Sequence, residues 1–150
     1  MGPEADKGGN IADLGSEFDL KMKLYLADPQ GNQFMGIGVL WLLQHIDSFG
    51  SIRKAAVHMN LSYVKAHRML TDLEQHLQLK IVERKKGGER REGASLTPVG
   101  RRFMEVYDRF QAAVKRQAEP LFAEFKSEIM QEIKTGSPPD QSSGKQDPAK

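Results

Sequence analysis

The sequence predicts a mainly α-helical fold with a small β-sheet and a long C-terminal helix. Three observations lead to this prediction. Two short amphipathic stretches meet at residues 60–62, two short β-type segments flank the stretch KKGGERREG, and an apolar repeat continues for about 35 residues from residue 98. A chain of 150 residues is long enough for one domain with a modest core.

Polar tails are expected at both ends of the chain. Residues 1–17 are polar and rich in glycine, and residues 135–150 are of low complexity, so we expect both to be disordered. Between them we expect a compact domain over residues 18–97 and a long helix over residues 98–134.

The first elements of the domain are a strand and a helix. In DLKMKLYLA, residues 19–27, apolar side chains alternate with polar ones, which predicts a half-buried strand, and the DPQGN that follows is typical of a turn. The stretch FMGIGVLWLLQHIDSFG, residues 34–50, predicts a helix with Ile37, Leu40 and Trp41 on its apolar face. Gly50 suits the C-terminal cap of this helix.

Two shorter helices are expected next, each with a serine in front of it. Ser51 is placed to cap a helix over residues 52–59, and Ser62 to cap a second helix over residues 63–77. Asn60 tolerates the left-handed conformation that a tight turn between them needs. On the second helix, the spacing predicts an inner face of Ala66, Leu70, Leu73 and Leu77. Two helices joined in this way describe a helix-turn-helix.

A basic hairpin follows the two helices. KIVER and ASLTP are short strand-like segments, and the glycines between them permit a turn. Its cations, Lys85, Lys86, Arg90 and Arg91, would neutralise phosphates or enter a groove beside the second helix. A hairpin in this position is a wing, so the fold class becomes a winged helix-turn-helix.

The long last helix is expected to begin with Thr97 as its cap and Pro98 in its first turn. Pro120 predicts a kink or a break, because it cannot donate a hydrogen bond to the carbonyl of Arg116. The apolar stripe is longer than one small domain needs, so it either forms a two-fold dimer or folds back on its own domain. The candidate dimerisation residues are Phe103, Tyr107, Phe110, Val114, Leu121 and Phe125.

Positive charge is concentrated in the middle of the chain. The net charge of the whole sequence is only +2, but residues 51–102 carry twelve Lys and Arg against five Asp and Glu, a local net charge of +7. Such a region is either the footprint of a polyanionic partner or a solvated basic face.

Several classes of site find no support in the sequence. The chain has no cysteine, and no two of its four histidines have the helical spacing of a zinc site, so we expect no metal and no cofactor. No nucleophile triad or phosphate-binding glycine loop can be recognised, and we expect no enzyme activity. The sequence shows no signal peptide and no span of membrane length, so a soluble cytoplasmic protein is expected.

A set of motifs carries a resemblance to a known family. GSIRKAAVHMNLSYVKAHRMLTDLE, followed by VERKKGG and LTPVGRRFMEVYDRF, resembles the DNA-binding domain of ModE-type molybdate-responsive regulators, and more distantly that of LysR-type regulators. The matching features are the Gly-Ser opening, the Ala-Ala pair, LSY before the second helix, the paired glycines of the wing and the start of the last helix. The resemblance covers about residues 20–125.

The resemblance implies a winged helix-turn-helix that dimerises and binds an inverted repeat in double-stranded DNA near promoters. Many members of the family also have a C-terminal oxyanion-binding domain. Nothing after Ile133 is expected to fold into such a domain, so direct sensing of molybdate or tungstate is not expected, and if an effector is sensed, a partner protein could supply that function. The wing also differs, because ERRE places two cations between two anions where the family often has a glycine-rich tip.

Within this framework, Lys65 and Arg68 are the candidates for contact with base edges, since arginine can make a bidentate pair with guanine. Ser62 and the amides that follow it could bind a phosphate, and Tyr63 could either do so or pack in the core. The candidate DNA contacts are Ser51, Arg53, Ser62, Tyr63, Val64, Lys65, His67, Arg68, Lys85, Lys86, Arg90 and Arg91. The alternative function is a winged-helix protein-interaction module without specific DNA binding.

Overall fold

The computed structural model describes residues 19–85 and 93–136, and the chain divides into two units. The first unit, Met22–Lys115, contains all the strands, the first three helices and the beginning of the last helix. The second unit consists of the terminal residues, of which the structure describes residues 19–21 and 116–136.

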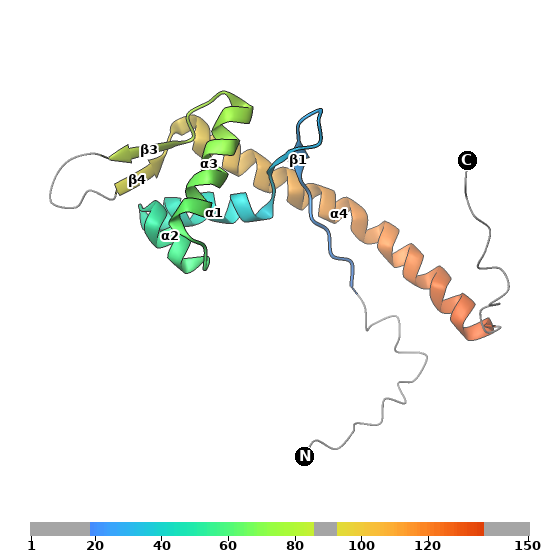
Figure 1. Ribbon diagram of the computed structural model, residues 1–150. Coiled ribbons are helices and arrows are strands. Elements are labelled where there is room, and N and C mark those ends of the chain that lie inside the picture. Colours follow the sequence, from blue (N-terminus) through green and yellow to red (C-terminus); the bar gives the residue numbers. More distant parts are fainter. Residues whose placement is uncertain (1–18, 86–92, 137–150) are drawn as a thin grey trace, which may run out of the picture. The chain divides into compact units, whose positions relative to one another are not determined.

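Helices predominate in the described part of the chain, and each of the two small sheets is an antiparallel pair (Figure 1). The elements follow in the order β1 (Leu26–Ala27), β2 (Gln33–Met35), α1 (Ile37–Phe49), α2 (Ile52–His58), α3 (Tyr63–Leu77), β3 (Val82–Lys85), β4 (Gly93–Leu96) and α4 (Pro98–Thr135). This order confirms the predicted mainly α-helical fold with a helix-turn-helix, a wing and a long last helix.

The first strand is shorter than predicted. Met22, Leu24 and Leu26 are half-buried and the residues between them are exposed, as the alternation predicted, but the hydrogen-bonded strand is only Leu26–Ala27. The prediction of a strand over the whole segment was wrong because its partner β2 has only three residues. An extended segment without a paired neighbour forms no ladder.

Helix α1 begins later than predicted. Residues 34 and 35 belong to β2, and Gly36 precedes the helix. Trp41, predicted on the apolar face, is 51% exposed, whereas Leu42, beside it in the sequence, is fully buried. The helix buries residues 40, 42, 43 and 46, and the centre of this face lies nearly opposite Trp41 on the helix. Gly50 ends α1 in the left-handed conformation, with φ +65°, as predicted.

The core lies between the helices of the first unit and the second hairpin. Its largest fully buried side chains come from β2, α1, α3 and the residue before β3: Met35, Leu40, Leu42, Leu43, Ile46, Leu73 and Ile81. Alanines 55, 56 and 66 are also buried, at the positions where α2 and α3 meet the rest of the core.

Hydrogen bonds outside regular structure attach the β3–β4 hairpin to the helices. The amide of Ala94 donates to the carbonyl of Gly50, at the junction of α1 and α2, over 2.9 Å. The buried hydroxyl of Thr97 donates to the carbonyl of Lys80 at 2.6 Å and accepts from the amide of Gly100 at 2.9 Å. Thr97 is therefore both the predicted cap of α4 and a link between α4 and the start of β3.

Helix α4 continues through Pro120 as a single element, so the chain is helical on both sides of the proline. Of the two expectations at this residue, the break does not occur, and the kink stays a prediction. Near the beginning of α4, the guanidinium of Arg101 makes two hydrogen bonds to the carboxylate of Asp47 on α1, at 2.9 and 2.6 Å.

Two helical glycines provide a matched test of this packing. A Cβ atom added at Gly100 would overlap the carbonyl oxygen of Ile81 and lie 3.0 Å from the hydroxyl of Thr97. We expect Gly100→Ala to lower the free energy of unfolding by about 1–3 kcal/mol, as overpacking does.

The control is Gly38→Ala in α1, where the nearest atom would be Met69 Cε at 3.9 Å, an ordinary contact. It should leave the stability unchanged or raise it by up to about 1 kcal/mol, through the higher helix propensity of alanine. Urea denaturation followed by circular dichroism measures both. Equal stability of the two variants would contradict the tight contact between α4 and the start of β3.

Candidate nucleic-acid interface

The helix-turn-helix is formed as the sequence predicted. Ser51 and Ser62 cap α2 and α3, their hydroxyl oxygens accepting from the amides of Lys54 at 3.1 Å and Lys65 at 3.0 Å. Between the helices, Asn60 adopts a positive φ of 57°, and the amide of Leu61 donates to the carbonyl of Ala56 at 2.8 Å. Local hydrogen bonds therefore set the turn that orients α3.

Helix α3 has a buried face and an exposed face. Ala66, Leu70 and Leu73 are buried against the core. Lys65 and Arg68 are exposed, and Val64 is 65% exposed. The helix therefore presents two cations and one apolar side chain to solvent within its first two turns.

The side chains on the edge of this exposed face are half-buried. His67 and Tyr63 are both of intermediate exposure, with their rings 6.1 Å apart. The guanidinium of Arg53, on α2, lies 5.0 Å from the centre of the Tyr63 ring. Tyr63 thus packs beside the core and contacts an arginine at the surface, and its contact with a phosphate stays a prediction.

Ser51 is buried, unlike the other candidate DNA contacts that the structure describes. Its side chain is only 4% exposed, and its hydroxyl caps α2. It therefore offers little surface to a phosphate, whereas Ser62 caps α3 and remains exposed.

The described part of the wing adds a further cation. In the β3–β4 hairpin, Val82 pairs with Leu96 and Lys85 with Gly93, and Lys85 is exposed. The predicted contacts Lys86, Arg90 and Arg91 lie outside the described residues. Of the four predicted wing cations, the described residues therefore include only Lys85.

A cleft of about 770 Å³ lies between α3 and the hairpin. Its polar lining includes His67 and Thr71 from α3, Ser95 from β4, and the cations Lys80, Arg84 and Lys85. Lys80 and Arg84 were not among the predicted contacts. The concentration of Lys and Arg in residues 51–102 was the signal that could have indicated them, but it does not show which cations lie beside α3.

Carboxylates also line this cleft, and one of them has a structural role. Glu74 Oε2 accepts hydrogen bonds from the amides of Ile81 at 2.7 Å and Val82 at 3.2 Å. The carboxylate therefore joins α3 to the start of the hairpin. Glu83 also lines the cleft, on the hairpin side, and partly offsets the cations there.

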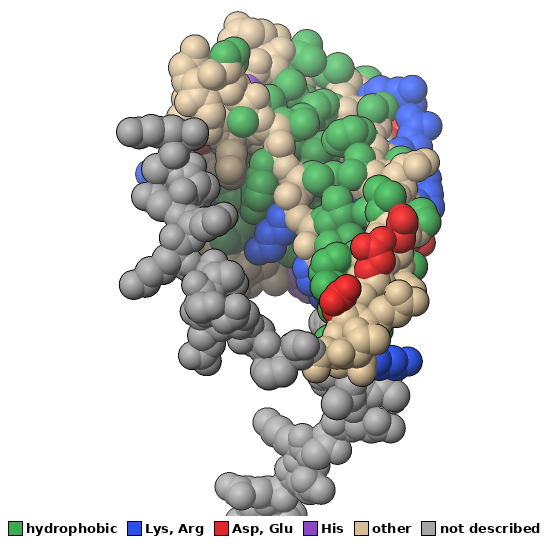
Figure 2. Space-filling model, turned by 90° about the vertical axis from the view of Figure 1, so that its right-hand side faces the viewer, with side chains coloured by type: hydrophobic (Ala, Val, Ile, Leu, Met, Phe, Trp, Pro, Cys, Tyr) green, Lys and Arg blue, Asp and Glu red, His purple; other side chains and the backbone are tan. Residues whose placement is uncertain are grey.

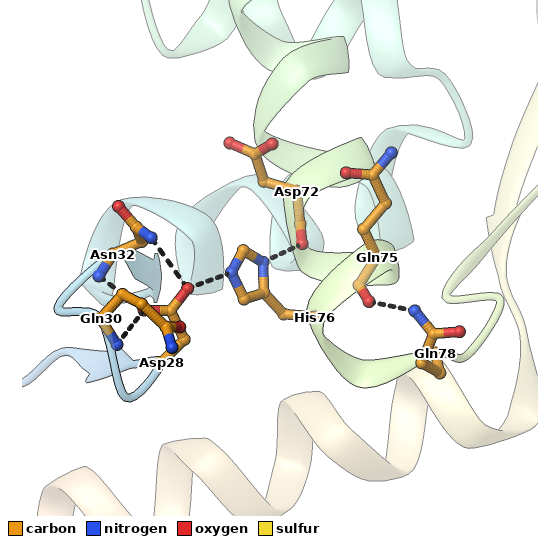
Figure 3. A network of polar contacts seen from close by, with 7 residues as sticks. All are labelled: Asp28, Gln30, Asn32, Asp72, Gln75, His76 and Gln78. Atoms are coloured by element: carbon orange, nitrogen blue, oxygen red, sulfur yellow. Dashed lines mark hydrogen bonds and ion pairs between the residues drawn. The ribbon is translucent and has the colours of Figure 1, made fainter.

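A second polar network lies at the C-terminal end of α3 (Figure 3). His76 Nε2 lies 3.2 Å from Asp28 Oδ2 in the turn between β1 and β2, and His76 Nδ1 lies 2.8 Å from the carbonyl oxygen of Asp72. Hydrogen bonds from the side chain and backbone of Asn32 lower the pKa of Asp28 to about 2. The hydrogen bonds to Asp72 and Asp28 raise the pKa of His76.

The candidate dimerisation residues differ in exposure. Phe110, Leu121 and Phe125 are between 49% and 67% exposed, and Phe103 and Val114 are half-buried. Tyr107 is only 4% exposed, and its hydroxyl donates to the carbonyl of Leu24 at 2.8 Å. Burial also raises the pKa of Tyr107.

Tyr107 and part of Phe103 thus pack within their own domain, whereas Phe110, Leu121 and Phe125 present apolar surface. The space-filling view shows a broad area of hydrophobic side chains on one face of the molecule, with charged side chains toward its edge (Figure 2).

Within the described ranges, no three His, Asp or Glu side chains are grouped so that they could hold a metal ion. Among the helices of these same ranges, none has the length and hydropathy to cross a membrane. The features that the described chain does offer are the exposed face of α3, the adjoining cleft and the stripe on α4.

Comparison with known proteins concerns the part of the chain that contains α3 and the adjoining cleft. Residues 39–101 match the family described as bacterial regulatory helix-turn-helix protein, lysR family. The chain is also 35% identical over 89 residues to the DNA-binding transcriptional dual regulator ModE of Escherichia coli K12, and equally to the transcriptional regulator ModE of Shigella flexneri.

The matched segment is 59% of this chain and 30% of the length of each of these relatives. Residues 39–101, which the family model matches, include the helix-turn-helix, the hairpin and the beginning of α4. The chain therefore carries a LysR-type helix-turn-helix domain similar to that of ModE.

Proposed function

We propose that this protein is a transcriptional regulator that binds specific sites in double-stranded DNA as a homodimer. The observation that carries the proposal is the exposed face of α3, on which Lys65 and Arg68 project from a helix whose other face is buried. A recognition helix needs this combination, because it must be fixed on the domain and accessible to base edges in the major groove.

The side chains of α3 would divide the recognition between them. Arg68 can make a bidentate contact with guanine, worth about 1–3 kcal/mol of discrimination against another base. Val64, which is 65% exposed at the start of the helix, suits contact with the methyl group of thymine. Ser62 and the first amides of α3 lie where a phosphate can bind at a helix N-terminus.

Cations beside α3 would hold the DNA backbone. Lys80, Arg84 and Lys85 line the cleft between α3 and the hairpin, and Arg53 is exposed on α2. Each phosphate that such a side chain neutralises steepens the salt dependence of binding by roughly one unit of slope. These residues position the protein on the duplex, whereas α3 supplies the specificity.

The dimer would form through α4. Phe110, Leu121 and Phe125 repeat at helical spacing, and all three are exposed. A two-fold dimer would bring two copies of α3 to successive major grooves, with half-sites about one helical turn apart or a multiple of it. The operator would then be an inverted repeat near promoters. Sensing of an effector through a partner protein stays a prediction, and we propose no catalytic activity.

A protein-interaction module is the second candidate function. Trp41 and Phe49 on α1 are 51% and 40% exposed, and the ring of Phe49 lies near those of His45 and His58, with centres 5.7 and 5.1 Å apart. Exposed aromatic side chains favour protein contacts. This surface is distinct from α3, so variants of α3 discriminate between the two functions.

The first prediction concerns the double variant Lys65→Glu, Arg68→Glu. Charge reversal at two base contacts should weaken binding to an operator by about 100-fold or more, since each such contact contributes about 1–3 kcal/mol. The operator is obtained by selecting genomic fragments with the purified protein, and binding is measured by fluorescence anisotropy.

The control reverses Lys21 and Lys23 instead, which changes the net charge equally on the exposed segment before β1. It should retain most of the affinity. If both double variants bind as the native protein does, or if the native protein enriches no genomic fragment, the interaction module becomes the better proposal.

The second prediction separates the two roles of Ser62. Ser62→Ala removes the cap of α3 and should lower the free energy of unfolding by about 1 kcal/mol. Ser62→Asp should keep the stability of the native protein, because aspartate is an equally good cap, yet weaken DNA binding by repelling a phosphate. If Ser62→Asp binds DNA as tightly as the native protein, no phosphate lies at this end of α3.

The third prediction concerns the dimer. Leu121→Glu with Phe125→Glu should convert a dimer into a monomer, because charged side chains in the stripe oppose its burial. Analytical ultracentrifugation measures the change. Ala123→Glu is the control, because residue 123 is exposed and lies about 200° round the helix from residue 121. A monomeric native protein, or a dimer unaffected by the double change, would exclude this interface.

A further inference from the structure

Both ring nitrogens of His76 face hydrogen-bond acceptors. Nδ1 lies 2.8 Å from the carbonyl oxygen of Asp72, one turn earlier in α3, and Nε2 lies 3.2 Å from a carboxylate oxygen of Asp28 in the β1–β2 turn (Figure 3). Neither acceptor has a proton to donate. Both hydrogen bonds therefore depend on protons carried by the imidazole ring.

A neutral imidazole has one N–H group, whereas the imidazolium has two. In one neutral tautomer the lone pair of Nε2 would face the Asp28 carboxylate, and in the other the lone pair of Nδ1 would face the Asp72 carbonyl. Only the cation satisfies both contacts. The position of the ring between two acceptors thus points to a protonated His76.

The turn holds Asp28 in its ionised form. Asp28 Oδ1 accepts from the amides of Gln30 at 3.0 Å and Asn32 at 2.9 Å, and Oδ2 accepts from the side-chain amide of Asn32 at 3.0 Å. These donors favour the carboxylate, so the pKa of Asp28 falls to about 2. A permanent negative charge is therefore fixed beside Nε2 of His76.

The surroundings of the ring also favour a cation. The ring of Phe34, on β2, stacks on His76 with centres 4.6 Å apart and planes within 7°. A cation over an aromatic face is stabilised by the electrons of that face. The charged groups that act on His76 are Asp28 from the turn and Asp72 from its own helix, and both are negative. His76 also lies in the last turn of α3, where the helix dipole favours positive charge.

The contact joins two parts of the domain that are far apart in the sequence. His76 and Asp28 are 48 residues apart, and their side chains are only 26% and 18% exposed. At the same end of α3, Glu74 binds the amides that begin the second hairpin. One end of the candidate recognition helix is thus attached to both hairpins, and the attachment through His76 is the one whose strength changes with protonation.

We propose that His76 is a positioning residue for α3, which in its protonated form holds the C-terminal end of this helix to the β1–β2 turn. Loss of the proton removes the ionic attraction to Asp28 and leaves one N–H group for two acceptors, which weakens this attachment. The consequence for DNA binding rests on the proposed function: α3 would be held in its binding orientation at lower pH and would bind DNA less well as the pH rises.

The sign of the effect follows from proton linkage. The pKa of His76 is raised in the folded protein, so the contact contributes stability that is fully present below the ordinary histidine pKa of 6.5. This contribution is lost as the pH rises through the raised value. Asp28 stays ionised throughout this range, so His76 is the partner whose charge changes.

The contact is tested first without DNA, by nuclear magnetic resonance of the full chain. The titration midpoint of His76 should lie above 6.5 and should fall in Asp28→Asn. The matched control, Glu128→Gln, removes an exposed carboxylate of α4 and should leave the midpoint unchanged. The amides of residues 28–32 should shift with the same midpoint in the native protein. A midpoint at or below 6.5, or one unaffected by Asp28→Asn, would overturn the proposal.

The second measurement compares DNA affinity of the native protein and His76→Gln at about pH 6 and about pH 8, the range in which histidine changes charge. Glutamine can donate to Asp28 without titrating, so its binding should vary less with pH than that of the native protein, which should weaken several-fold. Equal pH dependence in the two proteins would overturn the positioning role. A shifted His76 midpoint in a protein that binds no DNA at either pH would support the contact and reject the proposed function instead.

Discussion

The close approach of α2 and α3 is the constraint on which the rest of the candidate interface depends. The alanines of these two helices, Ala55, Ala56 and Ala66, each have at most 1% of their surface exposed to solvent. Since an alanine side chain ends at Cβ, these positions let the helices pack closely, and a larger side chain would push them apart. The buried leucines of α3 can then reach the core, while Lys65 and Arg68 on its other face stay in solvent. Exposure of the basic face is thus a result of packing on the opposite side of the same helix.

Polar contacts at the other end of α3 complete its attachment. The carboxylate of Glu74 binds two backbone amides at the start of the second hairpin, and the ring of His76 contacts the turn of the first. The amide of Ala94 links the same second hairpin to the junction of α1 and α2. Apolar burial therefore fixes which face of α3 is accessible, and these hydrogen bonds fix its position relative to the two hairpins.

Features governed by local rules were predictable from the sequence. The bounds of α3, the serine caps of α2 and α3 and the left-handed Asn60 agree with expectation because each depends on neighbouring residues. Features that depend on distant partners were not. The direction of Trp41, the length of β1 and the contact between His76 and Asp28 follow from how the elements pack. The cations of the cleft illustrate the same limit, because Lys80 and Arg84 become candidates only when the hairpin lies beside α3.

Thr97 gives this arrangement a mechanical property. Its buried hydroxyl is bonded both to the carbonyl of Lys80, before β3, and to the amide of Gly100 in α4, and Gly100 leaves no space for a side chain against Ile81. The base of the hairpin and the first turn of α4 are therefore joined through one buried side chain, so a displacement of one is transmitted to the other. If the proposed dimer forms through α4, a change in the crossing angle of its two long helices would therefore displace the base of each hairpin as well.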